Sequence, residues 1–429
     1  MKPSTGRPTS DSVRLRTLYP VVRARTESLC EPLALEDCVV QSMPDASPTK
    51  WHLAHTSWFF ETFVLKRAVA SYREFHPGYA LFFNSYYHAA GERHPRPERG
   101  LLSRPTLAEV RRYRAHVDGW MGALLAGEHG ALSAELAFAI ELGMNHEEQH
   151  QELLLTDVKH LLWCNPLLPT YRERAPDTRP AAATRSEWIS FDGGPIEIGT
   201  DSPIFAFDNE RPRHRRWVEP FELARRPVSC GEYLEFMAAG GYEQFQHWLS
   251  DGWDVCQRER WCAPLFWRRD GQTWLAQTLN GVRLVYPAEP VCHVSYFEAD
   301  AYARWRGVRL PSEEEWEHAA EGEELAGNLL DTDQLHPAPC MRPGKRIDQL
   351  FGDVWEWAAS AYTPYPGFRP FADDLGEYNG KWMNNRFVLR GGSCVTPARH
   401  IRASYRNFFP PEARWQFSGL RLARSPKNS

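Results

Sequence analysis

The segment NHEEQHQELLL (residues 145–155) decides how the first part of the chain folds and what it can bind. Four residues advance an α-helix by about 400°, so His150 lies only about 40° around the helix from His146. Leu142 and Leu154 lie on the same face, which turns both imidazoles toward the interior of a helical bundle. Two buried imidazoles need polar partners, and this spacing is typical of a pair that binds one metal ion.

A second segment, WHLAHTSWFFE (residues 51–61), offers a third ligand. His55 shares a helical face with Trp51 and Trp58, which points it into the core, whereas His52 lies at the edge of that face. We therefore choose His55 over His52. Glu152 is about 240° around the helix from His146 and does not complete a two-histidine, one-carboxylate set. The alternative is that these are ordinary core histidines.

Three neutral imidazoles suit zinc, iron, nickel or copper, so the ligand set alone does not choose the metal. It does predict an open site, because three protein ligands leave coordination positions free for substrate.

The apolar residues around these segments recur at helical spacing up to about residue 168. Four helices are predicted, at residues 31–40, 51–70, 106–125 and 133–163, and they form a bundle over residues 1–168. Residues 169–185 are rich in Pro, Arg and Ala and are interpreted as a linker.

Residues 186–429 have a different sequence pattern, with short predicted strands, paired glycines and many tryptophans. We expect an α+β domain there. The pattern predicts a hairpin over 191–199, a strand entering a turn at 387–392, and helices at 229–239 and 295–306. A further helix begins after Ser312, with Glu315 at the capping-box position.

The composition of the chain excludes some classes of function. The chain has 429 residues, with 50 Lys and Arg against 55 Asp and Glu, for a net charge of −5. No long run of one sign provides a footprint for nucleic acid. No apolar stretch reaches membrane length and no signal peptide is visible, so we expect a soluble, cytoplasmic protein without a membrane partner. The nine cysteines contain no CxxC pair, which indicates mostly reduced thiols.

The first domain resembles DinB-like metal-binding bundles, which share a first-helix His (His55) and the HxxxHxE pattern at residues 146–152. The second domain resembles the formylglycine-generating-enzyme, C-type-lectin-like fold. Its matching segments are FDGG (191–194), NERP (209–212), PVCHVS (290–295), RLPSEEEWE (309–317), GDVWEW (352–357), LRGGS (389–393) and GLRLA (419–423). Together the two domains resemble the non-heme iron sulfoxide synthases of ergothioneine biosynthesis (EgtB type).

This resemblance implies Fe(II) held by His55, His146 and His150. The family uses O2 to join a thiol sulfur to C2 of the imidazole of trimethylhistidine, and it oxidises that sulfur to a sulfoxide. Gln149, on the ligand face about 60° from His146, would hydrogen-bond the substrate imidazole. Arg93 and Arg96 stand where the family places a pair of arginines for the carboxylate of the thiol substrate; the alternative is a solvated basic loop.

Family members also use an active-site tyrosine as a proton donor. In those to be compared first it comes from the lectin-like domain, where Tyr378 is a weak match. FFNSYY (residues 82–87) offers a different solution, the tandem Tyr86 and Tyr87. Adjacent side chains are expected to diverge, so we predict that at most one of them faces the metal; a packing role is the alternative.

The segment YRNFF (residues 405–409) aligns with the part of the family that binds the trimethylammonium end of the substrate. Phe408 or Phe409 could provide ring faces for the cation, and Asn407 could contact the carboxylate. Phe409 replaces an acidic residue of some members, which favours free cysteine over gamma-glutamylcysteine as the thiol.

Formylglycine-generating enzymes use a cysteine pair, but here Cys394 stands alone, so we do not expect their copper-dependent activity. The second domain is then expected to bind substrate, with the active site between the domains.

Three other hypotheses remain: a DinB-like metal-dependent thiol S-transferase, a sensor or binding module with a structural metal, and an ovothiol-type synthase acting on histidine. Ovothiol synthases commonly carry an added methyltransferase domain, which we do not expect in this chain.

Overall fold

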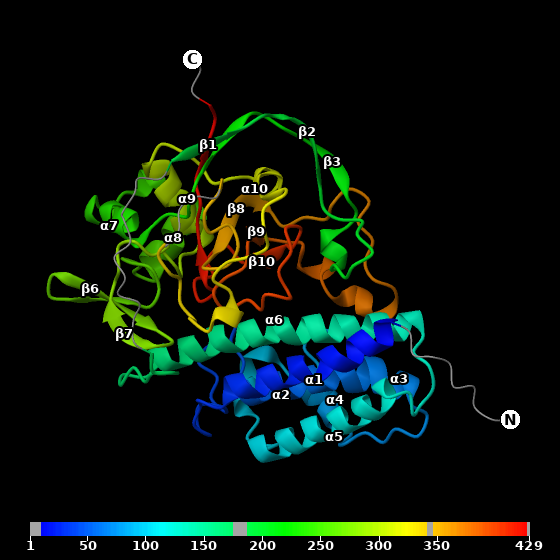
Figure 1. The fold of residues 1–429 in the computed structure, drawn as a ribbon. Helices are drawn as coiled ribbons and strands as arrows, with labels where there is room; N and C mark the ends of the chain where they lie inside the picture. Colours follow the sequence, from blue (N-terminus) through cyan, green and yellow to red (C-terminus); the bar gives the residue numbers. More distant parts are fainter. Residues whose placement is uncertain (1–9, 175–186, 341–345, 427–429) are drawn as a thin grey trace. The chain divides into compact units, whose positions relative to one another are not determined.

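The structure is a computed structural model, and it describes residues 10–174, 187–340 and 346–426. The chain divides into two compact units, residues 1–164 and 165–429 (Figure 1). The segment interpreted as a linker, 169–185, lies outside the described residues from residue 175 onward. Each unit is described by itself.

The first unit is helical, as predicted. Its described residues form four long helical segments, and α1 is the first. The second is α2, which continues without a break into one π-helical turn (η1) and then into α3. The elements are α1 (Ser10–Cys30), α2 (Thr49–Phe60), η1 (Glu61–Leu65), α3 (Lys66–Ala68), α4 (Tyr79–Phe83), the 3-10 helix η2 (Arg96–Leu101), α5 (Leu107–Leu125) and α6 (Ala134–Cys164).

Helix α2 is the centre of this unit, since every one of its residues is buried and it packs against both α5 and α6. Gly143 of α6 permits the close approach to α2: a Cβ atom there would lie 2.6 Å from the ring of Phe60. The approach occurs one turn before His146. It therefore brings the histidine-bearing faces of α2 and α6 together.

The predicted helix at residues 31–40 is wrong, because these residues form turns. The first helix is instead α1, which ends at Cys30 and buries Leu15, Tyr19 and Val22 at helical spacing. Pro20 and the many arginines of α1 obscured that spacing. The apolar residues of 31–40 imitated a helix, but Leu35 is 65% exposed.

The second unit combines four small sheets with short helices, as expected for an α+β domain. Its strands are β1 (Trp188–Phe191), β2 (Gly194–Ile198), β3 (His214–Val218), β4 (Phe221–Ala224), β5 (Trp267–Asp270), β6 (Thr273–Thr278), β7 (Gly281–Leu284), β8 (Trp355–Ala361), β9 (Phe387–Arg390), β10 (Asn407–Phe409), β11 (Ser418–Gly419) and β12 (Ala423–Arg424). The sheet orders are β1-β4-β12, β10-β9-β8-β11, β2-β3 and β5-β6-β7.

Its helices are α7 (Cys230–Ala238), α8 (Ser250–Arg258), α9 (Tyr296–Trp305) and α10 (Glu313–Ala320), with 3-10 turns η3 (Asp208–Glu210), η4 (Phe245–His247), η5 (Leu330–Thr332), η6 (Asp373–Glu377) and η7 (Gly380–Trp382). The predicted capping box of Ser312 and Glu315 is confirmed, and the strand at β9 enters its turn at Gly391, whose φ is +96°. The predicted helices at 229–239 and 295–306 are α7 and α9.

The predicted hairpin over residues 191–199 is wrong. β1 pairs with β4 and β2 pairs with β3, both antiparallel, so the two strands on either side of Gly193 belong to different sheets. At Gly193 a Cβ atom would lie 2.5 Å from the backbone nitrogen of Pro220, so the glycine permits a close crossing of chains rather than a hairpin turn.

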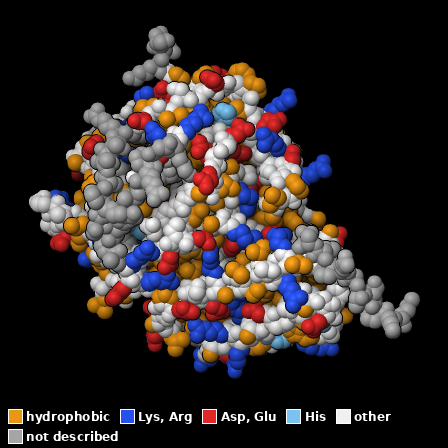
Figure 2. Space-filling model, in the orientation of Figure 1, with side chains coloured by type: hydrophobic (Ala, Val, Ile, Leu, Met, Phe, Trp, Pro, Cys, Tyr) orange, Lys and Arg blue, Asp and Glu red, His pale blue; other side chains and the backbone are white. Residues whose placement is uncertain are grey.

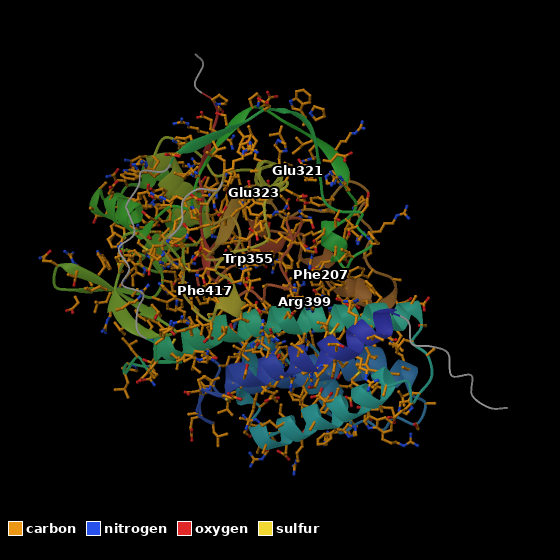
Figure 3. The ribbon with its side chains drawn as sticks, in the orientation of Figure 1. Phe207, Glu321, Glu323, Trp355, Arg399 and Phe417 are labelled. Atoms are coloured by element: carbon orange, nitrogen blue, oxygen red, sulfur yellow. The ribbon has the colours of Figure 1, made fainter. Side chains whose placement is uncertain are left out.

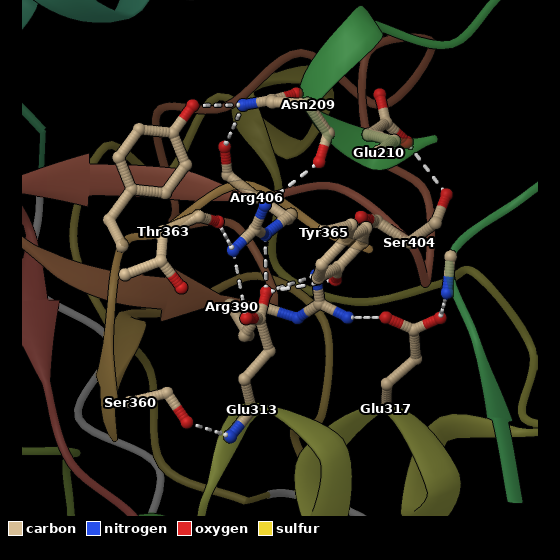
Figure 4. A network of polar contacts seen from close by, with 12 residues as sticks. Asn209, Glu210, Glu313, Glu317, Ser360, Thr363, Tyr365, Arg390, Ser404 and Arg406 are labelled. Atoms are coloured by element: carbon tan, nitrogen blue, oxygen red, sulfur yellow. Dashed lines mark hydrogen bonds and ion pairs between the residues drawn. The ribbon is translucent and has the colours of Figure 1, made fainter. Parts of the chain in front are cut away.

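The interior of the second unit holds aromatic rings and a buried charged network. Phe207, Trp355 and Phe417 project among the sheets and are at most 2% exposed (Figure 3). In the network, Arg406 donates to Glu313 at 2.6 Å, while Arg390 pairs with both Glu313 and Glu317 (Figure 4). These pairs anchor α10 to β9 and to Arg406, the residue that precedes β10.

Charged side chains of both signs are interspersed over the displayed surface, in agreement with the near-balanced composition (Figure 2). None of the described helices combines the length and the apolar character that crossing a membrane requires.

Candidate metal centre

Three histidines of the first unit converge on one point. His55 comes from α2, and His146 and His150 come from successive turns of α6. One ring nitrogen from each lies within 4.8 Å of the others, and all three side chains are buried. A metal ion needs several histidine, cysteine or acidic side chains close together. Within the described part of the chain, these three histidines are the group that meets this condition.

Hydrogen bonding determines which nitrogen of His55 points into the centre. Its Nδ1 lies 2.6 Å from the carbonyl oxygen of Phe83, which can only accept, so Nδ1 carries the proton and Nε2 presents a lone pair. That Nε2 lies 3.1 Å from Nε2 of His146. Two ring nitrogens facing each other at this distance are the donor arrangement that a metal ion would bridge.

Burial keeps the three imidazoles uncharged. It lowers the pKa of His55 and of His150 well below the usual value for histidine, and in both cases the neighbouring His146 adds to the effect. The pKa of His146 is lowered to about 3, again because of burial, against an opposing contribution from Glu147. Neutral imidazoles are the form that binds metals, so the donor set fits a transition metal such as iron or zinc.

Large aromatic rings enclose the three histidines. Trp51 and Trp58 both stack on His55, with centroids 4.5 and 5.5 Å away, and Phe59 lies 4.8 Å from His146. These rings come from the same α2 segment that carries His55. They restrict the imidazole orientations and exclude water from this side of the centre.

A buried carboxylate fixes α6 beside the centre. Glu147 accepts hydrogen bonds from Arg23 of α1 at 2.8 Å and from Arg114 of α5, and Arg114 also donates to Thr56 at 3.1 Å. Burial alone would raise the pKa of Glu147, but Arg114 and Arg23 lower it to about 2. Because Thr56 and Glu147 adjoin His55 and His146, the guanidinium of Arg114 holds the two ligand-bearing helices in register.

Two residues that the sequence did not select lie behind His150. Nδ1 of His52 is 2.8 Å from Nδ1 of His150, and Nε2 of His52 is 3.1 Å from Oδ2 of Asp157. Helical spacing could have found both, because His52 precedes His55 by three residues and Asp157 follows His150 by seven, which keeps each near the ligand face.

Tyr86 and Tyr87 lie directly after α4. Tyr87 is fully buried and its ring centroid is 4.9 Å from Phe63 and 5.7 Å from Trp58; Tyr86 is half-buried. The expectation that the two side chains diverge is wrong, since their rings stack at 4.6 Å with an angle of 24°. The reason is that residues 84–87 form an irregular turn closed by Asn84, so the alternation of a strand does not apply.

The three arginines after these tyrosines differ in burial. Arg93 and Arg96 are exposed, and they donate to the backbone oxygens of Ser85 and Asp45. Arg99, which the sequence analysis did not select, is only 3% exposed, and its guanidinium lies 3.4 Å from the centroid of the Trp51 ring. Trp51 in turn stacks on His55.

Arg99 has no carboxylate partner in an ion pair among the described residues; it donates to the hydroxyls of Ser47 at 2.9 Å and Ser85 at 3.0 Å. Its Nε atom is buried without a hydrogen-bond partner there. Burial and the positive charges of Arg96 and Arg93 lower the pKa of Arg99, against an opposing contribution from the more distant carboxylate of Asp157. A buried guanidinium in this state suits a bound anion.

The remaining candidates are Gln149, which lies between two of the three histidines in the sequence, and residues of the second unit. Gln149 is half-buried on α6. In the second unit, Asn407, Phe408 and Phe409 form β10 and are half-buried; Phe408 stacks on Tyr362 at 4.1 Å, and Phe409 meets Trp415 edge-on at 5.8 Å. Tyr378 is 3% exposed and stacks on Phe207.

Two protein families match this chain, one in each of its two units. The model described as DinB superfamily matches residues 19–154, and the sulfatase-modifying factor enzyme 1-like domain matches residues 173–342 and 345–426. The chain is 33% identical over 408 residues to a hercynine oxygenase of Mycolicibacterium thermoresistibile, covering 89% of this chain and 88% of the relative. It is 35% identical over 431 residues to the hercynine oxygenase of Mycobacterium tuberculosis, covering 94% and 96%. Ergothioneine biosynthesis protein 1 of Schizosaccharomyces pombe is 28% identical over 234 residues, which are 52% of this chain and 28% of that protein.

Proposed function

We propose a function for this chain from the premise that it belongs to the family of the hercynine oxygenases. In this proposal the chain is a sulfoxide synthase of ergothioneine biosynthesis. It joins the sulfur of a small thiol to C2 of the imidazole of N-alpha-trimethylhistidine (hercynine) and adds one oxygen atom to that sulfur. The observation that carries the proposal is the convergence of His55, His146 and His150 in a chain of this family.

The reaction balances with O2 as the four-electron oxidant. The C2–H and S–H bonds are lost and a C–S bond forms, which removes two electrons, and oxidation of the sulfur to the sulfoxide removes two more. One oxygen atom of O2 ends on sulfur and the other in water. Fe(II), held by His55, His146 and His150, would supply the activation of O2 and the binding of the thiol sulfur.

The protein residues orient the substrates in this proposal. Gln149, which follows His146 by three residues on α6, hydrogen-bonds the imidazole of trimethylhistidine. Phe408 and Phe409 present ring faces to the trimethylammonium group, and Asn407 contacts the carboxylate of the same substrate. The stacking of Phe408 on Tyr362 supports this part, because it fixes the orientation of the Phe408 ring.

The carboxylate of the thiol substrate binds to the arginines of the segment 93–99. The sequence resemblance selects Arg93 and Arg96. The environment of Arg99 adds a third member, which is buried and forms no ion pair with a carboxylate of the described residues. Free cysteine is the preferred thiol over gamma-glutamylcysteine, because Phe409 offers no charge to the larger, more polar molecule.

Tyr86 and Tyr87 supply the phenol that donates a proton during sulfur oxygenation. Their stacked rings support a shared function in which one phenol acts and the other fixes its orientation. Loss of the phenol would leave the thiol open to direct dioxygenation in place of coupling.

The proposal is tested by loading the full chain with Fe(II) without oxygen and then adding air, trimethylhistidine and either cysteine or gamma-glutamylcysteine. We expect a coupled sulfoxide by mass spectrometry, formed faster with cysteine. Faster turnover of gamma-glutamylcysteine would overturn the thiol preference alone. Absence of any coupled product and of O2 uptake with both thiols would overturn the proposed function and favour metal-dependent S-transfer.

A further inference from the structure

Behind His150, away from His55 and His146, a chain of polar contacts crosses from α6 to α2 and back. Nδ1 of His150 meets Nδ1 of His52 at 2.8 Å, and Nε2 of His52 meets Oδ2 of Asp157 at 3.1 Å. All three side chains are at most 8% exposed. We infer that His52 and Asp157 are positioning residues that fix the tautomer and ring orientation of His150 for metal binding.

The direction of the chain follows from its carboxylate end. An ionised carboxylate only accepts hydrogen bonds, and Oδ2 of Asp157 also accepts the backbone N–H of Ser47 at 2.8 Å. Nε2 of His52 therefore donates, and in a neutral imidazole this leaves Nδ1 as the acceptor. His150 must then carry its proton on Nδ1, and the lone pair of its Nε2 is directed toward the metal.

His55 obtains the same tautomer from the backbone, because its Nδ1 donates to the carbonyl oxygen of Phe83. At His150 the orienting group is the side chain of His52, so a substitution can remove it. Side chains that hydrogen-bond a ligating histidine without touching the metal change metal affinity by about 10–100-fold. The inference rests on the proposed metal centre and adds two residues that do not touch the metal.

His52→Phe is a more selective test than a substitution of Asp157, because Asp157 also accepts a hydrogen bond from the backbone of Ser47. Phenylalanine preserves an aromatic ring next to Trp51 but cannot accept a hydrogen bond from His150. The probe is Zn(II), titrated by competition with a chelator, since it suits imidazole donors and is inert to oxygen. We expect the dissociation constant to rise about 10–100-fold in His52→Phe.

His160→Phe is the matched control. His160 lies three residues beyond Asp157 on the same helix, but its Nδ1 contacts the hydroxyl of Ser42 at 2.8 Å instead of a ligand. Zn(II) affinity should be unchanged in this variant. If the wild-type chain itself fails to bind Zn(II) and Fe(II), the proposed metal centre is wrong; if the wild type binds and His52→Phe binds equally well, only the positioning inference is wrong.

A double-mutant cycle separates a chain of contacts from two independent effects. Asp157→Asn should weaken Zn(II) binding in the wild-type background but add little once His52 is phenylalanine, because the link to His150 is already broken. Full additivity of the two losses would contradict the inference.

Nitrogen-15 NMR of the histidines in the Zn(II)-loaded wild-type chain gives a readout that does not depend on the variants folding. We expect His150 to carry its proton on Nδ1 and to bind metal through Nε2, with His52 protonated on Nε2. A proton on Nε2 of His150, or metal bound at its Nδ1, would overturn the inference.

Discussion

The Nε2 atoms of His55 and His146 face each other at 3.1 Å, although 91 residues separate them in the sequence. Gly143 permits the helix contact that brings them together, and Arg114 joins the residues adjoining each of them. The two helices are thus held by groups other than the histidines. This arrangement suits an open metal centre that exists before the metal binds.

Substitution of a ligand should remove metal without unfolding the protein. His55→Ala or His150→Ala is expected to lower the bound iron from one equivalent to less than about a tenth and to abolish turnover, since two imidazoles bind far more weakly than three. Metal content after anaerobic reconstitution and gel filtration checks this. His116→Ala loses a contact to the backbone of Arg73 and ring contacts away from the three histidines, so it should retain iron. Full activity of an iron-stripped His150→Ala would contradict the assignment.

The phenol pair should control what happens to the thiol. The double variant Tyr86→Phe, Tyr87→Phe is expected to keep its iron but to lose at least about 90% of the sulfoxide product, because general acid catalysis contributes about 10²–10⁴-fold. The consumed O2 should then appear in oxidised thiol. Product masses from the wild type and the double variant provide the comparison, and an unchanged sulfoxide yield would remove the phenols from the mechanism.

Arg99 should control thiol affinity more strongly than the exposed arginines. Arg99→Lys keeps the charge but loses the planar fork, so we expect KM for cysteine to rise about 10–100-fold, as for the loss of one or two charge-assisted hydrogen bonds. Arg93→Lys is the matched control with a smaller effect. Steady-state kinetics at saturating trimethylhistidine measure both, with thermal unfolding as a check on the contacts to Ser47 and Ser85. Equal effects of the two variants would place the carboxylate elsewhere.

A buried carboxyl of the second unit should make stability depend on pH. Burial raises the pKa of Asp353 to about 6, despite hydrogen bonds from Ala338, Asn328 and Gln349. Its stabilising contribution is complete below the unfolded pKa near 4 and is lost as the pH rises through about 6.

Asp353→Asn should remove this loss, and Asn tolerates the φ of +57° at this position. The free energy of unfolding of the variant relative to the wild type should therefore increase between pH 4 and pH 7, by up to about 3 kcal/mol. Chemical denaturation at several pH values measures the difference. Parallel curves for the two proteins would contradict the shifted pKa.

Periodicity made the convergence of histidines predictable. The four-residue spacing of His146 and His150 defines one helix face, and the aromatic neighbours of His55 define another, so both faces had to be buried. The division into a helical part and an α+β part followed from the same change of pattern. Neither inference required knowledge of which helix packs on which.

Features that depend on packing could not be read in this way. His52 and Asp157 acquire their contacts only because α2 lies against α6, and Arg99 is buried only because the segment after α4 folds back over Trp51. The pairing of β1 with β4 joins residues 30 to 36 positions apart, whereas sequence patterns favour the nearest strand.

Labelled oxygen tests the central claim most directly. The Fe(II)-loaded chain, given ¹⁸O2, trimethylhistidine and cysteine, should release a coupled product whose mass exceeds that of the ¹⁶O2 product by 2 Da, because one oxygen atom of O2 enters the sulfoxide. His146→Ala, treated identically, should release none. Coupling without incorporation of ¹⁸O, or an equal yield from His146→Ala, would contradict a sulfoxide synthase centred on the three histidines.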